Sequence, residues 1–229
     1  MSTLRSFYEE LVYEEMVVRN PFRRVVPAAG APLTPTPALS FEEFTRLLTR
    51  IREEFGHPKR DLVARRDFAM IYLMGRLGLR RQEVQELKWR DIRGSVESRT
   101  ISVHGKGDKY ADVHVPADVF EVLEAWRVSI GHAAEVAPTP STPMFPVLFK
   151  AQDFVGIRLE PLAVITVGLT VKRRMLDAGF DGPRYGAHAL RATAATIAHE
   201  NGADLLTIAR LLRHANARTT QGYIRAAEN

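Results

Sequence analysis

Residues 186–225 read GAHALRATAATIAHENGADLLTIARLLRHANARTTQGYIR, and this stretch decides how the rest of the chain is interpreted. His188 and Arg191 lie three residues apart, so a helix would place both side chains on one face. His214 follows about two dozen residues later, and Tyr223 lies near the end of the stretch. Arginine offers only hydrogen-bond donors and cannot ligate a metal. The set therefore favours a cage for a phosphate group, with a phenol beside it.

Composition excludes several classes of protein. The 229 residues include no cysteine, so neither disulfides nor thiolate metal sites are expected. No apolar run is long enough to cross a membrane, and the first residues lack the apolar core of a signal peptide. We expect a cytoplasmic protein without membrane association.

Positive charge is concentrated in the segments that hold the motifs. The formal net charge is +5, with 9 basic and 5 acidic residues in 76–110 and 11 basic and 7 acidic residues in 150–229. A basic surface of this kind fits a polyanionic partner.

The first part of the chain predicts one helix and a linker. Residues 3–18 have the apolar spacing of an amphipathic helix, which stops before Pro21. Residues 27–38 are too rich in proline for regular structure. A single helix cannot bury its own apolar face, so it either docks on the main domain or is the remnant of another domain. We favour the second interpretation, with a remnant in 1–26, a linker in 27–38 and the main domain in 39–229.

The main domain is predicted to be mostly helical. Ser40 and Glu43 form a capping-box pattern, and Leu39 and Phe44 are placed to staple the helix that follows, which runs to about Phe55. Further helices are expected over residues 62–77, 81–87, 116–130, 161–178, 188–200, 204–213 and 218–227. Gly78 and Gly131 are the expected stops of two of them.

One region predicts β-structure. Residues 100–104 and 110–115 alternate apolar and polar side chains, and the segment between them, Gly-Lys-Gly-Asp-Lys, has the two glycines of a hairpin turn. A short strand is also indicated within 144–149. The fold class is therefore α+β, mainly α-helical, with a small antiparallel sheet.

Five motifs resemble those of tyrosine recombinases, the phage-integrase and Xer-type site-specific recombinases. Residues 78–83 (GLRRQE) resemble the first arginine box of that family, and 105–109 (GKGDK) resemble its lysine-bearing hairpin. Residues 188–191 (HALR) match its His-x-x-Arg box. The late histidine and the nucleophile are matched by 212–214 (LRH) and 219–223 (TTQGY). The resemblance extends from about residue 39 to the end of the chain.

The resemblance implies a fold, an activity and partners. The fold is the DNA breaking-rejoining domain with a three-stranded antiparallel sheet, and residues 1–26 correspond to the last helix of an N-terminal core-binding domain. The implied activity is site-specific cleavage and rejoining of DNA strands through a 3′-phosphotyrosyl intermediate, without metal, ATP or another cofactor. The implied partner is double-stranded DNA in the nucleoid, with a tetramer on DNA for the full-length protein and a monomer for this chain alone.

The resemblance also assigns roles to residues. The expected catalytic set is Arg80, Lys106, His188, Arg191, His214 and Tyr223, and the expected DNA-binding residues are Arg81 and Lys109.

The chemistry of these residue types agrees with the assigned roles. The two guanidinium groups suit the non-bridging oxygens because they donate in pairs and stay charged. Free tyrosine has a pKa of about 10, so positive groups must favour the phenolate. Lys106 is the expected general acid on the leaving oxygen. Of the histidines, His188 would shuttle the phenolic proton or hold an oxygen, and His214 would donate to a non-bridging oxygen.

Two features leave alternatives open. Relatives commonly carry glycine where this chain has Arg213, directly before the late histidine. Taken singly, each residue also has a structural interpretation: a solvated arginine, a solubilising lysine, a histidine at a helix end or a packed tyrosine.

The alternative functions are DNA relaxation of the type IB topoisomerase kind and non-enzymatic DNA binding on the same scaffold. The joint presence of all six residues favours the recombinase.

Overall fold

The computed structural model describes residues 8, 11–12, 16–17, 19–21, 36–105, 109–150 and 154–213. The chain divides into two units, residues 1–34 and 35–229, and all the elements below belong to the second. The helix expected over 218–227 lies outside the described residues, as does most of the helix expected over 3–18. The division into 1–26, 27–38 and 39–229 therefore stays a prediction.

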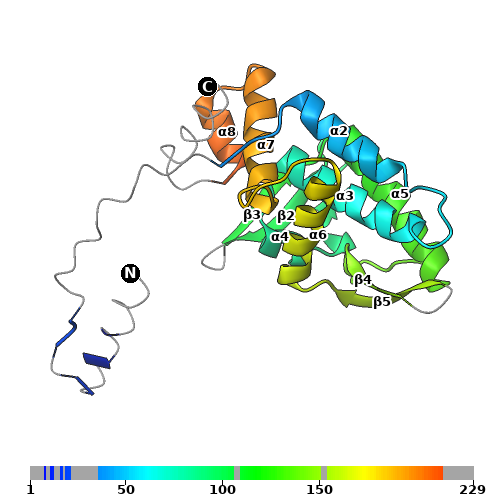
Figure 1. Ribbon diagram of the computed structural model, residues 1–229, viewed down its shortest axis with the longest axis horizontal. Coiled ribbons are helices and arrows are strands. Elements are labelled where there is room, and N and C mark those ends of the chain that lie inside the picture. Colours follow the sequence, from blue (N-terminus) through cyan, green and yellow to red (C-terminus); the bar gives the residue numbers. More distant parts are fainter. Residues whose placement is uncertain are drawn as a thin grey trace. The chain divides into compact units, whose positions relative to one another are not determined.

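Helices make up most of the described part of the second unit (Figure 1). They are α2 (Phe41–Arg52), α3 (Asp61–Leu77), α4 (Arg81–Glu86), α5 (Ala117–Ala134), α6 (Val164–Asp177), α7 (Ala187–Glu200) and α8 (Leu205–Leu211), with a 3-10 turn at Trp89–Asp91. The three-stranded antiparallel sheet has the order β1 (Ile92–Arg93), β2 (Thr100–Gly105), β3 (Lys109–His114). A second, two-stranded sheet pairs β4 (Pro146–Lys150) with β5 (Val155–Pro161). The predicted fold class and the small three-stranded sheet are confirmed.

The start of the domain follows the predicted cap. The Glu43 amide donates to Ser40 Oγ at 3.1 Å, and the Ser40 amide donates to Glu43 Oε2 at 2.9 Å. The Leu39 amide donates to Thr193 Oγ1 in α7 at 2.8 Å. The first residues of the domain are thus tied to the helix that carries the His-x-x-Arg box.

Helix α3 is the centre of the core. It packs against α2, α5 and α7, and more than half of its residues are buried. Its crossing with α2 is close, because a Cβ added to Gly75 would lie 2.3 Å from the ring of Phe44. The helix ends as predicted at Gly78, which is left-handed with φ +60°. Glycine adopts this conformation without steric cost, so the chain can turn sharply into the first arginine box.

Several helix boundaries differ from the sequence prediction: α2 ends at Arg52 and α8 at Leu211, earlier than predicted, and α5 and α6 differ for identifiable reasons. Helix α5 continues through Gly131 to Ala134 and is capped by Glu135, so the predicted stop at Gly131 is wrong. A glycine inside a helix costs only about 1 kcal/mol, which the burial of Ile130 offsets. Helix α6 starts three residues later than predicted, because residues up to Pro161 pair with β4 as strand β5.

A buried carboxylate connects α3 to α6. Asp67 is fully buried and accepts from Arg66 Nη2 at 2.7 Å and from Arg174 Nε at 2.8 Å. The Arg174 Nη1 also donates to Glu54 Oε2 at 2.9 Å, and Arg173 Nη2 lies 3.3 Å from Asp67 Oδ2. Because α6 packs on α4, this cluster helps to fix the surroundings of the first arginine box.

Asp67→Asn should lower the free energy of unfolding by about 3–5 kcal/mol, because it removes the counter-charge of the buried Arg66 guanidinium and leaves Arg174 with Glu54 alone. Urea unfolding followed by circular dichroism measures the loss. The control is Asp61→Asn, which removes a partly exposed carboxylate paired with Arg65 at 2.8 Å and should cost about 1 kcal/mol or less. Equal losses in the two variants would contradict a stabilising role for the buried cluster.

Candidate active site

Arg80 lies where the chain leaves the core. It is the N-cap residue of α4, in extended conformation two residues after the left-handed Gly78. Its Nη1 donates to Glu83 Oε1 at 2.6 Å, and its backbone amide donates to Glu83 Oε2 at 2.7 Å. The side chain is nevertheless 40% exposed. The guanidinium is therefore anchored at one end and open to an incoming group at the other.

Arg191 reaches the same turn from α7. Its side chain is buried, with Nη1 donating to the carbonyl of Gly78 and Nη2 to the carbonyl of Leu212. Leu212 is the C-cap residue of α8. One guanidinium thus holds together the end of α3, the helix α7 and the end of α8.

Glu83 supplies negative charge among these arginines. It is only 2% exposed and, besides Arg80, it accepts from Arg213 Nη2 at 2.8 Å. Burial alone would raise the pKa of Glu83, but the charge of Arg213 and the hydrogen bonds from Arg80 outweigh it and lower the pKa below its ordinary value. The carboxylate is therefore ionised when the protein is folded at neutral pH.

His188 lies one turn before Arg191 on α7 and is exposed to solvent. Its pKa is lowered first by partial desolvation and then by the positive charges of Arg81, Arg191 and Arg80. All three guanidinium groups therefore lie close enough to act on the imidazole. A histidine with a lowered pKa is neutral near pH 7 and can accept a proton.

Arg81 lies beside this cluster, against α6. A Cβ added to Gly168 would lie 2.9 Å from Arg81 Nη1, so a larger residue there would make this exposed, flexible side chain shift. The predicted DNA-binding side chain thus lies close to the backbone of α6.

The hairpin that carries the predicted lysines is attached to the arginine box at its base. His104 Nδ1 lies 2.8 Å from Glu86 Oε2 at the end of α4, and the Tyr110 ring stacks on the His104 ring with centroids 4.8 Å apart. Lys109 pairs with Gly105 across the hairpin. The side chain of Lys109 and all of Lys106 lie outside the described residues.

The structure thus brings together three residues of the predicted catalytic set, Arg80, His188 and Arg191, from three separate parts of the sequence. His214 and Tyr223, like Lys106, lie outside the described residues. Their roles stay predictions. In sequence, Lys106 directly follows strand β2, which ends at Gly105, and His214 and Tyr223 follow helix α8, which ends at Leu211.

Two residues of the cluster, Glu83 and Arg213, were assigned no role from the sequence. Glu83 lies one helical turn after Arg80, and a carboxylate at that spacing within a basic motif is the signal that could have identified it. Arg213 occupies a position where relatives commonly carry glycine, and its contact with Glu83 spans 130 residues. Nothing local in the sequence indicates that pairing.

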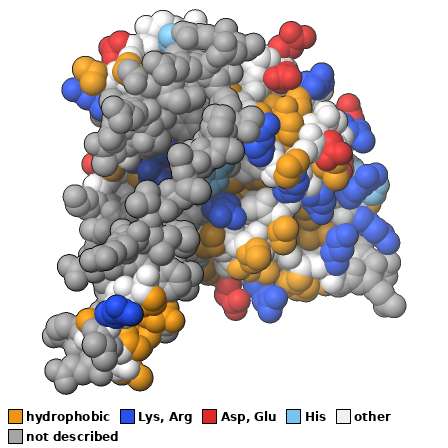
Figure 2. Space-filling model, turned by 60° about the vertical axis from the view of Figure 1, so that its left-hand side comes forward, with side chains coloured by type: hydrophobic (Ala, Val, Ile, Leu, Met, Phe, Trp, Pro, Cys, Tyr) orange, Lys and Arg blue, Asp and Glu red, His pale blue; other side chains and the backbone are white. Residues whose placement is uncertain are grey.

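Basic, apolar and some acidic side chains are intermixed over the right-hand half of the face in Figure 2. Among the described residues, no three His, Cys, Asp or Glu side chains are grouped so that they could hold a metal ion. No helix in the described part of the chain is long and apolar enough to cross a membrane.

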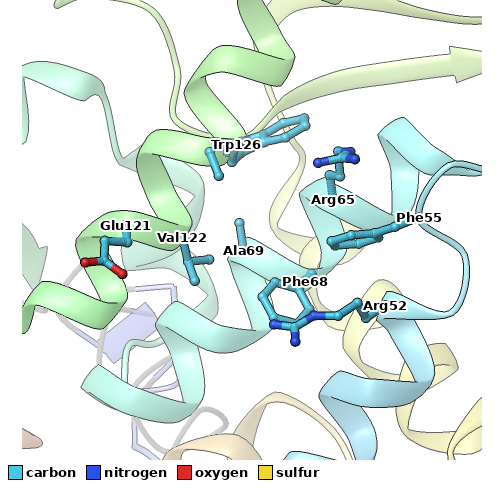
Figure 3. Close-up of a pocket in the computed structure, with 9 residues that line it drawn as sticks. Arg52, Phe55, Arg65, Phe68, Ala69, Glu121, Val122 and Trp126 are labelled. Carbon is cyan, nitrogen blue, oxygen red and sulfur yellow. The ribbon is translucent and has the colours of Figure 1, made fainter.

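A separate pocket of about 240 Å³ lies between α2, α3 and α5 (Figure 3). Arg52 and Arg65 line it, each over the ring of a phenylalanine, with distances of 4.9 Å to the Phe68 centroid and 4.8 Å to the Phe55 centroid. It contains none of the predicted site residues. The candidate chemistry is therefore assigned to the turn at Gly78 and not to this pocket.

Comparison with known proteins gives consistent matches. The model of the phage integrase family matches residues 38–229. The chain is 31% identical to the tyrosine recombinase XerC of Caldanaerobacter subterraneus, and the match covers 97% of this chain and 57% of the relative's length. It is also 31% identical to XerC of Azotobacter vinelandii, over 97% of this chain and 67% of the relative.

Two solved structures illustrate the likeness of fold. XerH site-specific recombinase bound to palindromic difH substrate, in a post-cleavage complex, has a TM-score of 0.65 at 26% identity, over 83% of this chain and 50% of that chain. A lambda integrase tetramer bound to a Holliday junction has a TM-score of 0.66 over all of this chain and 58% of that one, but at 16% identity it shows similarity of fold alone. The chain thus spans about half the length of several proteins that it matches.

Gly78→Ala should destabilise the protein by more than Gly56→Ala does. Both glycines have positive φ, +78° at Gly56 and +60° at Gly78, but only at Gly78 would the new Cβ collide, at 2.5 Å from Cδ2 of the buried Leu212. We expect a loss of about 1–2 kcal/mol for Gly56→Ala and about 1–3 kcal/mol more for Gly78→Ala. Thermal unfolding of both variants gives the comparison, and equal shifts in melting temperature would mean that the turn at Gly78 is not tightly packed.

Proposed function

Because the chain belongs to the phage integrase family, we propose that it is the catalytic part of a site-specific DNA recombinase that cleaves and rejoins DNA strands through Tyr223. The resemblance to tyrosine recombinases seen in the sequence motifs is confirmed by these comparisons. The observation that carries the proposal is the convergence of Arg80, Arg191 and His188 on the turn at Gly78. Three groups of this kind, drawn from distant parts of the chain, match the needs of a phosphate under attack.

The proposed reaction is a transesterification at phosphorus. The Tyr223 oxygen attacks, a 3′-phosphotyrosyl bond forms and the bond to the 5′-oxygen breaks. Lys106 gives a proton to the leaving 5′-oxygen. His188, held neutral by its surroundings, takes the phenolic proton, and His214 donates to a non-bridging oxygen. Rejoining is the same reaction in reverse.

The arginines supply the electrostatic part of the proposed catalysis. Arg80 and Arg191 neutralise the non-bridging oxygens as negative charge builds up on them. One preorganised donor of this kind is worth about 2.7–4 kcal/mol of transition-state stabilisation. We propose that these cations take the place of a metal ion. The phosphotyrosyl bond retains the energy of the broken bond, so rejoining needs no ATP.

Double-stranded DNA is the proposed partner, bound by Arg81 and Lys109 beside the reacting phosphate. Support comes from the similar XerH recombinase, which is described as bound to palindromic difH substrate. By analogy, the full-length protein would assemble on DNA, whereas this chain alone would be a monomer. The cytoplasmic, nucleoid-associated location stays a prediction.

Tyr223→Phe should abolish covalent attachment to DNA while leaving DNA binding nearly unchanged, because it removes one oxygen and keeps the ring. The protein is incubated with a nicked suicide duplex and the products are resolved in SDS, where a retarded band reports the adduct. Persistence of the band in the variant would show that another residue is the nucleophile. Binding without any band in the unmodified protein would favour a non-enzymatic DNA-binding module.

Arg80→Ala and Arg81→Ala form a matched pair of neighbouring substitutions. Arg80→Ala should slow adduct formation by about 10²–10³-fold, because it removes a donor to the transition state, and should change the Kd for DNA by less than about tenfold. Arg81→Ala should do the reverse, with weaker binding and a nearly unchanged single-turnover rate. Gel shifts and single-turnover cleavage separate the two effects. If both variants lose binding and rate in parallel, Arg80 is only a phosphate anchor.

A further inference from the structure

Arg213 has a backbone conformation that its residue type does not favour. Its φ is +52°, and among the described residues only Glu135, an exposed helix cap, is another non-glycine residue with positive φ. The Arg213 side chain is only 12% exposed. A strained and buried arginine persists only where its contacts offset the strain, and such positions cluster at functional sites.

The guanidinium of Arg213 lies at the centre of the cluster. Its Nη1 donates to the Leu211 carbonyl at 2.8 Å, and its Nη2 lies 3.3 Å from the Gly78 carbonyl and 2.8 Å from Glu83 Oε2. Its Nε is buried and has no hydrogen-bond partner in the described part of the chain. In the described part of the chain, Glu83 is the charged partner of Arg213, and this contact helps to offset the strain and the burial.

Glu83 binds two arginines at once. Arg80 donates to both carboxylate oxygens, through Nη1 and through its backbone amide, while Arg213 binds Oε2. A phosphate that binds through Arg80 Nη1 competes with Glu83 Oε1 for that nitrogen. If Arg80 were the only charged partner of Glu83, the buried Glu83 carboxylate would lose its compensating positive charge when Arg80 binds a phosphate. An uncompensated charge is costly in a protein interior.

We propose that Arg213 is a positioning residue that keeps Glu83 compensated, so that Arg80 can turn its guanidinium from Glu83 to a phosphate. The inference rests on the proposed function, because it takes the phosphate of DNA as the group that Arg80 meets. Arg213 acts through Glu83 and Arg80 and does not itself touch the reacting atoms. The same contacts fix the backbone directly before His214.

Arg213→Gly tests this role without straining the fold, since glycine accepts the positive φ. We expect the single-turnover rate of adduct formation on the suicide duplex to fall on the order of 10- to 100-fold, with the Kd for DNA changed less than about threefold. Arg213→Lys, which keeps the charge, should retain more of the rate than Arg213→Gly. The control is Arg210→Gln, which removes a positive charge from the exposed face of α8 and should leave the rate nearly unchanged. A rate in Arg213→Gly equal to that of the unmodified protein would overturn the proposal.

The second test is a rescue that a purely structural role would not produce. Glu83→Gln removes the charge that retains Arg80, so the double variant Arg213→Gly/Glu83→Gln should cleave faster than Arg213→Gly alone. Losses that multiply in the double variant would overturn the proposal. Circular dichroism and thermal unfolding of each variant show that the comparison is made between folded proteins.

A third measurement is independent of cleavage. Binding of inorganic phosphate, followed by ³¹P NMR titration, should be weaker in Arg213→Gly and restored in the double variant. Unchanged phosphate affinity in Arg213→Gly would overturn the role of Arg213 even where adducts form. If the unmodified protein forms no adduct at all, the proposed function fails, and the phosphate titrations still decide whether Arg213 releases Arg80.

Discussion

The carbonyl oxygen of Gly78 accepts hydrogen bonds from Arg191 and Arg213, and the geometry of the candidate site depends on this one atom. Glycine is required there because the residue is left-handed and because an added Cβ would meet Leu212. The turn joins the central helix α3 to the arginine box, while the two arginines come from α7 and from the end of α8. One backbone acceptor therefore sets the relative positions of motifs that are more than a hundred residues apart in sequence.

Charge balance is the second constraint. Arg80 and Arg213 both bind one buried carboxylate, Glu83, whose pKa stays low despite burial. Partial desolvation, and after it the neighbouring positive charge, lowers the pKa of His188 and keeps its imidazole neutral. A phosphate diester would supply the missing negative charge, so the arrangement is electrostatically complete only with a polyanion bound.

The sequence predicted those parts of the fold that depend on local sequence signals. The Ser40 cap, the stop at Gly78 and the glycine hairpin each depend on a few neighbouring residues. Strand β5 was missed because its pairing with β4 depends on residues beyond its own pattern, and Gly131 failed as a stop because tertiary packing outweighed its low helix propensity. The motif order indicated the catalytic set, but the partnership of Glu83 with Arg213 could not be predicted, since it exists only after the chain has folded. Lys106, His214 and Tyr223 stay sequence predictions.

In the proposed reaction, Arg80 and Arg191 act on one and the same phosphate. A crystal structure of the protein with a duplex that carries its cleavage site tests this arrangement. Non-bridging oxygens of one phosphate should lie within hydrogen-bonding distance, about 2.7–3.2 Å, of both guanidinium groups, with Arg80 turned away from Glu83 Oε1. A duplex whose nearest phosphate contacts neither arginine, or with Arg80 still bound to Glu83, would contradict it.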